Sequence, residues 1–250
     1  MRLLLLALLL AAPVGAQVNT ERLRTARDAD GMALALDASA AFATGNTEYL
    51  QVGVGGRLDA RLGSHAGFVV GRMDLGRTDG ASFVDRSFAH ARVTTPLRDW
   101  LAAEAFTQIE RNRQQRLDAR TLVGAGLRAA VVEADSAALA VGLTPMLEVE
   151  ILDEALGGEQ DAVVRLSTYL SGRLAVGPRA AVSAVVYAQP RADVAGDVRV
   201  LGQAAIDVGL TRAVALRVRL NVRHDSRPPG EVERTDVSVE NGLVILLPAP

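Results

Sequence analysis

Polar and apolar residues alternate along most of the chain. Between Arg116 and Val131, charged residues and glycines dominate one set of alternate positions, and Ala, Leu, Val and Thr fill the other. A period of two predicts an extended strand with one polar and one apolar face, and no segment shows a convincing apolar stripe of helical period. The pattern recurs and predicts strands at about 32–44, 49–63, 66–75, 86–94, 100–111, 116–131, 137–151, 162–174, 179–189, 197–211, 213–224 and 234–247.

The connections between these predicted strands alternate in length. Every second connection is short, as in GSHA, EADS and TR, whereas the others are mostly longer and more polar, as in GRTDGASFVD, DEALGGEQD and DSRPPGEVER. Short turns on one side and longer loops on the other, with an even strand number, are typical of an outer-membrane β-barrel. Most segments also reach the roughly 9–11 residues that a tilted membrane strand needs. Pro145, inside 137–151, predicts a bulge or local break because proline cannot donate to a strand ladder.

The two faces of the strands allow two arrangements. In a soluble barrel the apolar face would have to fill the interior, and its Ala and Val side chains are too small for a tube of this many strands. In a membrane barrel the apolar face meets lipid, and the charged face lines the lumen. The reverse orientation is excluded because an arginine at mid-bilayer costs about 2–4 kcal/mol. We therefore expect an all-β, closed antiparallel up-and-down transmembrane β-barrel of about 12 strands, although its 4% aromatic content is low for the usual aromatic girdles.

The first residues predict export. Arg2, the apolar run from Leu3 to Ala12 and the small residues before Gln17 form a signal-peptide pattern that is too short to span a membrane as a helix. We expect a signal peptide at 1–16, a periplasmic leader at 17–30 and the barrel at 31–250, with cleavage near Ala16. The bacterial outer membrane is the expected location. The chain has no cysteine, and its net charge of −2 gives no reason to expect binding to nucleic acid.

The charged face holds nearly equal numbers of acids and arginines, which favours pairing across a narrow or plugged lumen. Folding 116–131 and 137–151 about a turn at 132–136 places Arg120 opposite Glu148 and Asp118 opposite Glu150. The following hairpin then brings Arg165 near Glu148. We therefore expect an internal lattice of Arg120, Glu148 and Arg165; solvated charges in a wide pore are the alternative.

Catalysis has little support in the sequence. The chain contains no G-x-S-x-G, P-loop or H-E-x-x-H motif. His224 and Ser226 flank Asp225, but neighbouring strand residues point to opposite faces. The acidic loop at 153–161 lacks the spacing of a calcium-binding loop and is expected to be solvated. We therefore expect no enzyme activity, no metal and no cofactor.

Several short motifs occur in one order along the chain: VNTERLR, TGNTE, EAFTQ, RTLVGAGLR, RLSTY, YAQP followed by DVR, and DSRPPG. Their order resembles that of the salt-induced outer-membrane proteins of Gram-negative bacteria (the DUF481 family), over nearly the whole chain after the signal peptide. The resemblance implies an outer-membrane barrel without established chemistry. Together with the pattern, it gives a candidate lumen charge lattice of Glu104, Gln108, Asp118, Arg120, Arg128, Glu148, Glu150, Arg165, Tyr169, Tyr187, Asp197 and Arg199.

The expected role is structural, in the cell envelope, or a narrow passive passage for small solutes. The expected partners are outer-membrane lipids and, during biogenesis, the barrel-assembly machinery. Two alternatives stay open at this point: a soluble periplasmic β-sheet protein that binds a lipid or another apolar ligand, and an outer-membrane hydrolase.

Overall fold

The computed structural model describes residues 30–44, 48–78, 81–153, 157–158, 160–211 and 214–245. The predicted signal peptide and almost all of the predicted leader lie outside these residues. The described chain forms twelve strands: β1 Gly31–Ala43, β2 Tyr49–Leu62, β3 His65–Thr78, β4 Ala81–Arg98, β5 Leu101–Asn112, β6 Leu117–Glu133, β7 Ala137–Leu152, β8 Gln160–Gly177, β9 Ala180–Pro190, β10 Val198–Gly209, β11 Val214–Asp225 and β12 Thr235–Ile245.

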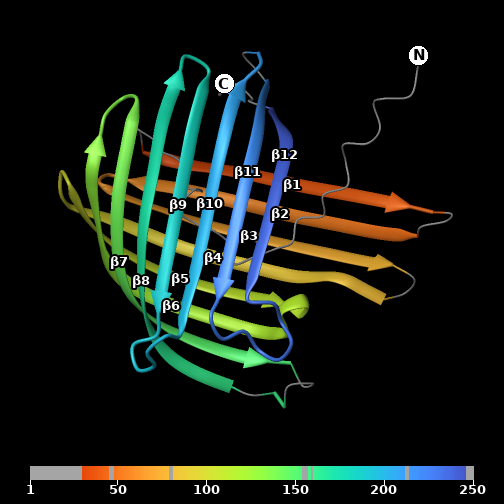
Figure 1. Cartoon of the computed structure of the whole chain (residues 1–250). Helices are drawn as coiled ribbons and strands as arrows, with labels where there is room; N and C mark the ends of the chain where they lie inside the picture. Colours follow the sequence, from red (N-terminus) through yellow and green to blue (C-terminus); the bar gives the residue numbers. More distant parts are fainter. Residues whose placement is uncertain are drawn as a thin grey trace, which may run out of the picture.

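The twelve strands form one antiparallel up-and-down sheet. Each strand pairs with the next along the chain, in the order β1 to β12 without a crossover. The sheet is strongly curved, so that the strands of the first half pass behind those of the second half and cross them in projection (Figure 1). This confirms the predicted all-β, up-and-down topology. The described residues contain no helix that is long and apolar enough to cross a membrane.

The strand boundaries differ from the prediction mainly at the β3–β4 hairpin. The stretch GRTDGASFVD, expected to be a long loop, continues both strands as far as Thr78 and Ala81. Its Gly76, Ser82 and Val84 pair within the ladder, so only two residues separate the strands. The glycines and polar residues of this stretch misled the prediction, because their composition is that of a loop.

Pro145 lies inside β7 and pairs with Leu166 of β8 without a shift of register. On its other side the β6–β7 ladder keeps one register from Gly124↔Met146 to Leu127↔Leu143, but Pro145 and Thr144 are not paired with β6 in this described ladder. The structure therefore has no bulge at Pro145, and the predicted local break is confirmed on the β6 side, where the ladder is interrupted. The bulges of this hairpin lie instead on β6, between Leu117 and Ala119 and between Ala130 and Val132.

The sheet exposes its apolar face and buries its charged face, which is the reverse of the arrangement in a soluble protein. Large apolar side chains point outward; Val123, Leu143 and Leu147 are 53%, 49% and 48% exposed. Charged side chains of the same two strands, β6 and β7, are buried on the opposite face; Arg120 and Glu148 are each only 2% exposed. The charged face is thus the concave, inner face of the sheet, as the alternation predicts.

The two edges of the sheet are not joined within the described residues. β1 pairs with β2 and β12 pairs with β11, and no pairing between β1 and β12 is observed there. The closure expected from the sequence is therefore not observed in this part of the chain.

Candidate functional site

Arg199, on β10, is the centre of an ionic network on the inner face. Its guanidinium contacts Glu148 at 2.6 Å, Glu150 at 2.8 Å and Asp225 at 2.8 Å. Asp225 lies opposite Arg199 on neighbouring β11, but the two glutamates lie on β7, which is separated from β10 by β8 and β9. The side chain of Arg199 therefore ties together parts of the curved sheet that are not neighbours in it.

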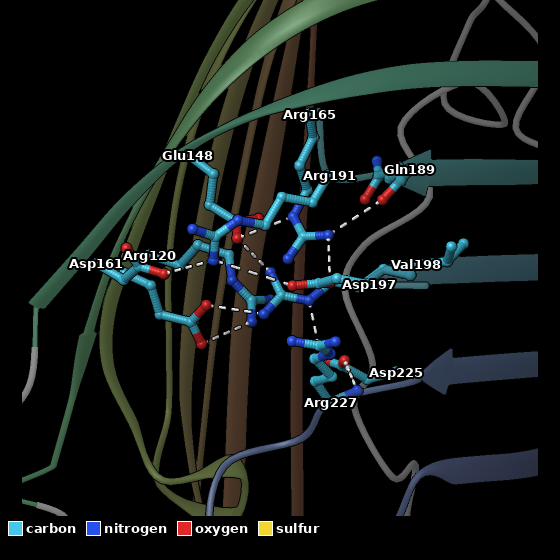
Figure 2. A network of polar contacts seen from close by, with 12 residues as sticks. Arg120, Glu148, Asp161, Arg165, Gln189, Arg191, Asp197, Val198, Asp225 and Arg227 are labelled. Carbon is cyan, nitrogen blue, oxygen red and sulfur yellow. Dashed lines mark hydrogen bonds and ion pairs between the residues drawn. The ribbon is translucent and has the colours of Figure 1, made fainter. Parts of the chain in front are cut away.

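Two further arginines extend this network, parts of which are shown in Figure 2. Arg165, on β8, donates to Glu148 at 3.1 Å and to Asp197 at 2.8 Å (Figure 2). Arg120, on β6, donates to Glu110 of β5 at 2.7 Å and to Glu150 at 3.1 Å. The ionic lattice, as we call it, is therefore continuous across the sheet and consists of Glu110, Arg120, Glu148, Glu150, Arg165, Asp197, Arg199 and Asp225.

The expected pairing of Arg120 is wrong in detail. Arg120 lies opposite Glu150, and Leu122 lies opposite Glu148. The turn is tighter and later than predicted, since Ala134 and Ala137 bond to each other through their main chains, and the bulge between Ala130 and Val132 adds one residue to β6. Arg120 consequently pairs with Glu110 and Glu150, and Arg199 takes the predicted place beside Glu148. The predicted pairing of Arg165 with Glu148 is confirmed.

Asp118 does not join the lattice within the described residues. It is the extra residue of the bulge between Leu117 and Ala119, and it is half-buried. The predicted pair of Asp118 with Glu150 is therefore wrong, because the bulge removes Asp118 from the alternation on which the prediction depended.

At the loop end of the sheet, Arg191 continues the ionic contacts outward. Its guanidinium donates to Asp193 at 2.6 Å and to Asp161 at 2.9 Å, and it lies 4.0 Å from Asp197. The hydrogen bond from Arg191 lowers the pKa of Asp193 below its usual value. Since Asp161 and Asp193 are mostly exposed, this outer group orders the loop and adds little stability.

A second contact across the inner face joins β8 to β5. The hydroxyl of Tyr169 donates to Glu104 at 2.8 Å, and Glu104 also lies 3.5 Å from Arg92 and 3.9 Å from Arg128. To reach Glu104, the ring of Tyr169 lies directly over Gly142 of β7, where an added Cβ would come within 1.9 Å of the ring. The inner face of RTLVGAGLR is similarly closed to side chains, since a Cβ on Gly126 would lie 2.1 Å from the carbonyl oxygen of Leu143.

His90 lies in a stack of aromatic rings beside this contact. Its ring centroid is 5.6 Å from those of Phe68 and Phe106, with interplanar angles of 26° and 19°. Nδ1 of His90 is 3.2 Å from Oε1 of Gln108, whose amide nitrogen donates to Glu110 of the ionic lattice at 3.0 Å. The side-chain amide of Gln108 thus connects the aromatic stack to the ionic lattice.

A small, partly open pocket, which we call the chamber, is lined by Tyr169 and Gln108 on the inner face. Its volume is about 30 Å³, enough for roughly two water molecules. Its lining combines aromatic, aliphatic and uncharged polar groups with one arginine: His90, Arg92, Phe106, Gln108, Leu122, Thr144, Ser167, Tyr169, Tyr187, Gln189 and Leu201.

Except for Asp118, the predicted lattice residues lie in one of these groups. Tyr187 packs against Tyr169 with ring centroids 5.3 Å apart. The prediction missed Glu110, Asp225, Arg92 and His90 as members of the site. Glu110 and Asp225 share the polar alternation, which gave a signal for them; the contacts of His90 depend on neighbouring strands and left no local signal.

The chemistry of the site is that of ion pairing and uncharged hydrogen bonding. Among the described residues no group of three or more His, Asp or Glu side chains is arranged to hold a metal ion. The carboxylates of the ionic lattice accept bonds from arginines that are themselves buried. The arrangement can block, narrow or rigidify the space inside the sheet.

Comparisons with known proteins give one match to a family. The model of a protein family of unknown function, DUF481, matches residues 36–245, which include nearly all of the strands, and it is the family that the ordered motifs indicated. A search of curated proteins gives no match.

Among solved structures, the chain is similar to a NanC porin, at 7% identity over 86% of this chain and 99% of that one, with a TM-score of 0.49. It is also similar to a bacterial polysaccharide outer membrane secretin, at 7% identity over 79% and 82% of the two chains, with a TM-score of 0.44. Both scores describe a weak likeness, so the fold is assigned from the chain's own strand pairing.

Proposed function

The chain belongs to the DUF481 family, and we propose that it is an outer-membrane β-barrel whose lumen is held nearly shut by paired charges. In this proposal β1 and β12 close the sheet, because unpaired strand edges are not stable in hydrocarbon. The protein then has a structural role in the envelope or gives narrow, passive passage to small solutes.

The observation that carries the proposal is the inverted polarity of the sheet. Leucine, valine and isoleucine side chains are exposed along the outer face of most strands, for example Val69, Ile109, Leu170 and Ile206 at 49–54% exposure. In water such a continuous apolar surface would cause aggregation, whereas in a bilayer it is the surface that lipid solvates. Bacterial outer membranes are where barrels of this architecture reside.

The buried charges support a narrow lumen over a wide, solvated pore. Arg120, Arg165 and Arg199 are 2–5% exposed and each contacts at least two carboxylates. In a wide pore these groups would be hydrated and largely independent. Their mutual contacts, together with the Tyr169–Glu104 bond, cross the space enclosed by the curved sheet.

The soluble alternative is disfavoured by the same geometry. A periplasmic sheet that binds a lipid would hold its apolar face inside a concave surface. Here the concave face carries Glu104, Arg120 and Glu148, and the convex face carries the apolar residues. A bound lipid would have to lie on the outside of the protein.

Expression of the full chain in a Gram-negative host tests the proposal. We expect the protein in the outer-membrane fraction, resistant to extraction by urea and carbonate, with a shift in electrophoretic mobility between unheated and boiled samples. Planar-bilayer recording then separates the two roles, since a structural barrel gives no conductance and a narrow passage gives small steps. Recovery in detergent-free buffer as a stable soluble protein would overturn the proposal.

A further inference from the structure

Charged side chains occupy the outer face of three neighbouring strands at the loop end of the sheet, the end with the longer connections. Arg77 of β3 and Asp85 of β4 each lie opposite an exposed leucine of the preceding strand. Arg111 of β5 is two residues beyond Ile109, which is 54% exposed. Since alternate strand residues share a face, all three point outward.

A further arginine lies beside them in the 3₁₀ turn η2, Arg113–Gln115, which follows β5. Arg113 and Arg111 lie 3.7 Å and 3.9 Å from the same carboxylate oxygen of Asp85, and their side chains are 60% and 46% exposed. Both distances exceed a hydrogen bond, so both guanidiniums keep donors available. Arg77 is exposed and forms no ion pair with a described residue.

We call Arg77, Arg111 and Arg113 the basic patch. With Asp85 it comprises three arginines and one aspartate, a net formal charge of +2. On the second half of the sheet, the outward positions nearest the loops of the described strands carry neither an acid nor an arginine. From β8 to β12 these positions are Gln160, Pro190, Val198, His224 and Thr235. General contact with charged headgroups acts all round a barrel, so a patch confined to β3–β5 indicates one localised anionic ligand.

Apolar side chains adjoin the basic patch on the side away from the loops. Met73, Leu75 and Ile109 belong to the same strands and are 45%, 42% and 54% exposed. Two residues along a strand span about 7 Å, so the charged and apolar surfaces are in direct succession. A ligand with both an anionic group and apolar chains can contact the two surfaces together, whereas a free ion uses only the first.

Phosphate is the anionic group that fits this patch. A guanidinium binds phosphate oxygens through paired, charge-assisted hydrogen bonds. A phosphate monoester carries a charge of about −1.5 to −2 at neutral pH, which balances the patch, whereas a phosphodiester carries a single charge.

From this geometry we infer that the basic patch binds the headgroup of a lipid that carries a phosphate monoester, with its acyl chains against the outer face of β3–β5. The inference rests on the proposed function, because it requires the outer face to lie in a bilayer. The tests below keep the two separate.

The test uses the full chain in micelles of an uncharged detergent and measures lipid binding by native mass spectrometry. The probe is diphosphorylated lipid A, a glucosamine lipid with two phosphate monoesters, and the comparison lipid is phosphatidylglycerol, a phosphodiester. We expect lipid A to bind roughly 10-fold more tightly than phosphatidylglycerol, because its headgroup has more charge for the arginines. Inorganic phosphate at millimolar concentration should not displace lipid A; displacement would make this a site for the free anion and overturn the lipid assignment.

Variants locate the site. Arg111→Gln/Arg113→Gln should weaken lipid A binding by about 20-fold, since each arginine at a headgroup layer contributes about 5-fold. Asp85→Asn should strengthen binding by about 2- to 5-fold, because it removes the carboxylate that competes for both guanidiniums. Arg227→Gln/Arg234→Gln is the matched control: it removes the same charge from exposed positions in the β11–β12 connection, at the same end of the sheet, and should bind as the parent does.

Equal weakening in the two double variants, or an unchanged affinity in Arg111→Gln/Arg113→Gln, overturns the inference. If either result occurs in a protein that retains heat-dependent mobility, the barrel stands and only the lipid site fails. Recovery of the chain as a soluble protein without detergent instead removes the proposed function, and the lipid site with it.

Discussion

Replacement of Arg199 by glutamine tests whether the ionic lattice holds the inner face together. The change removes contacts to Glu148, Glu150 and Asp225, whose side chains are 3%, 12% and 4% exposed. Glu148 keeps Arg165 and Glu150 keeps Arg120. Asp225 keeps the main-chain N–H of Arg227 but loses its ion pair.

The expected loss of stability follows from the contacts that each carboxylate keeps. Removal of one partner from a buried ion pair costs about 3–5 kcal/mol, because the remaining charge stays buried and uncompensated. Asp225 comes closest to that position, since it keeps only the charge of nearby Arg223 without a direct ion pair, whereas each glutamate keeps one directly paired arginine. We therefore expect Arg199→Gln to lower the free energy of unfolding by about 3–5 kcal/mol. The lost contacts to the two glutamates contribute less than the sum of their separate energies, because all these groups belong to one network.

Arg217→Gln is the matched control on neighbouring β11. Arg217 forms one ion pair with Asp207, and both side chains are about one-third exposed, so the expected loss is within about 1 kcal/mol. Equilibrium urea unfolding in lipid vesicles, followed by circular dichroism, measures both variants. If Arg199→Gln costs no more than Arg217→Gln, the buried charges are hydrated in a wide pore and the lattice interpretation is refuted.

Three further changes test other parts of the structure. Gly142→Ala should displace the Tyr169 ring that lies over it. We expect it to lower the free energy of unfolding by about 1.5–3 kcal/mol, as Tyr169→Phe should, because each change removes the bond to the charged Glu104. If Gly142→Ala leaves the stability unchanged in the same assay, the close approach of the ring is contradicted. Leu143→Arg on the outer face should destabilise the protein in vesicles by about 2–4 kcal/mol, and Leu62→Arg at the turn end by about 0–1 kcal/mol; equal costs would argue against a lipid-facing surface. Arg191 lowers the pKa of the Asp193 carboxyl. The stability that this pair contributes is therefore present at neutral pH and is lost as the pH falls through the pKa of Asp193 in the folded protein. An NMR titration of Asp193 should show a higher midpoint in Arg191→Gln, and an unchanged midpoint would contradict the assigned cause.

The strand pattern was predictable because each strand has one face in contact with charges and the other exposed and apolar. That constraint acts on every second residue, so the alternation in 116–131 and 137–151 locates β6 and β7 to within about two residues. The same rule fails for GRTDGASFVD, where the strands continue without an apolar face to mark them.

The partners within the site were less predictable, because register and curvature are not local properties. A single bulge at Val131 and a tight turn at Ala134–Ala137 moved Arg120 from Glu148 to Glu150. The contact of Arg199 with Glu148 joins strands three places apart in the sheet. No pattern along the chain encodes how far a sheet curves, so such a contact is visible only in three dimensions.

The position of Arg199 late in the chain has a consequence for biogenesis. It reaches Glu150 across 49 residues of sequence, so a nascent protein that has emerged only as far as β9 carries these glutamates without their shared cation. Until β10 is added, Glu148 and Glu150 each have only one of their two arginine partners, Arg165 and Arg120 respectively. A chain that ended before Arg199 would lack the cation that Glu148 and Glu150 share, so about the last fifth of the sequence completes the charge balance of the inner face.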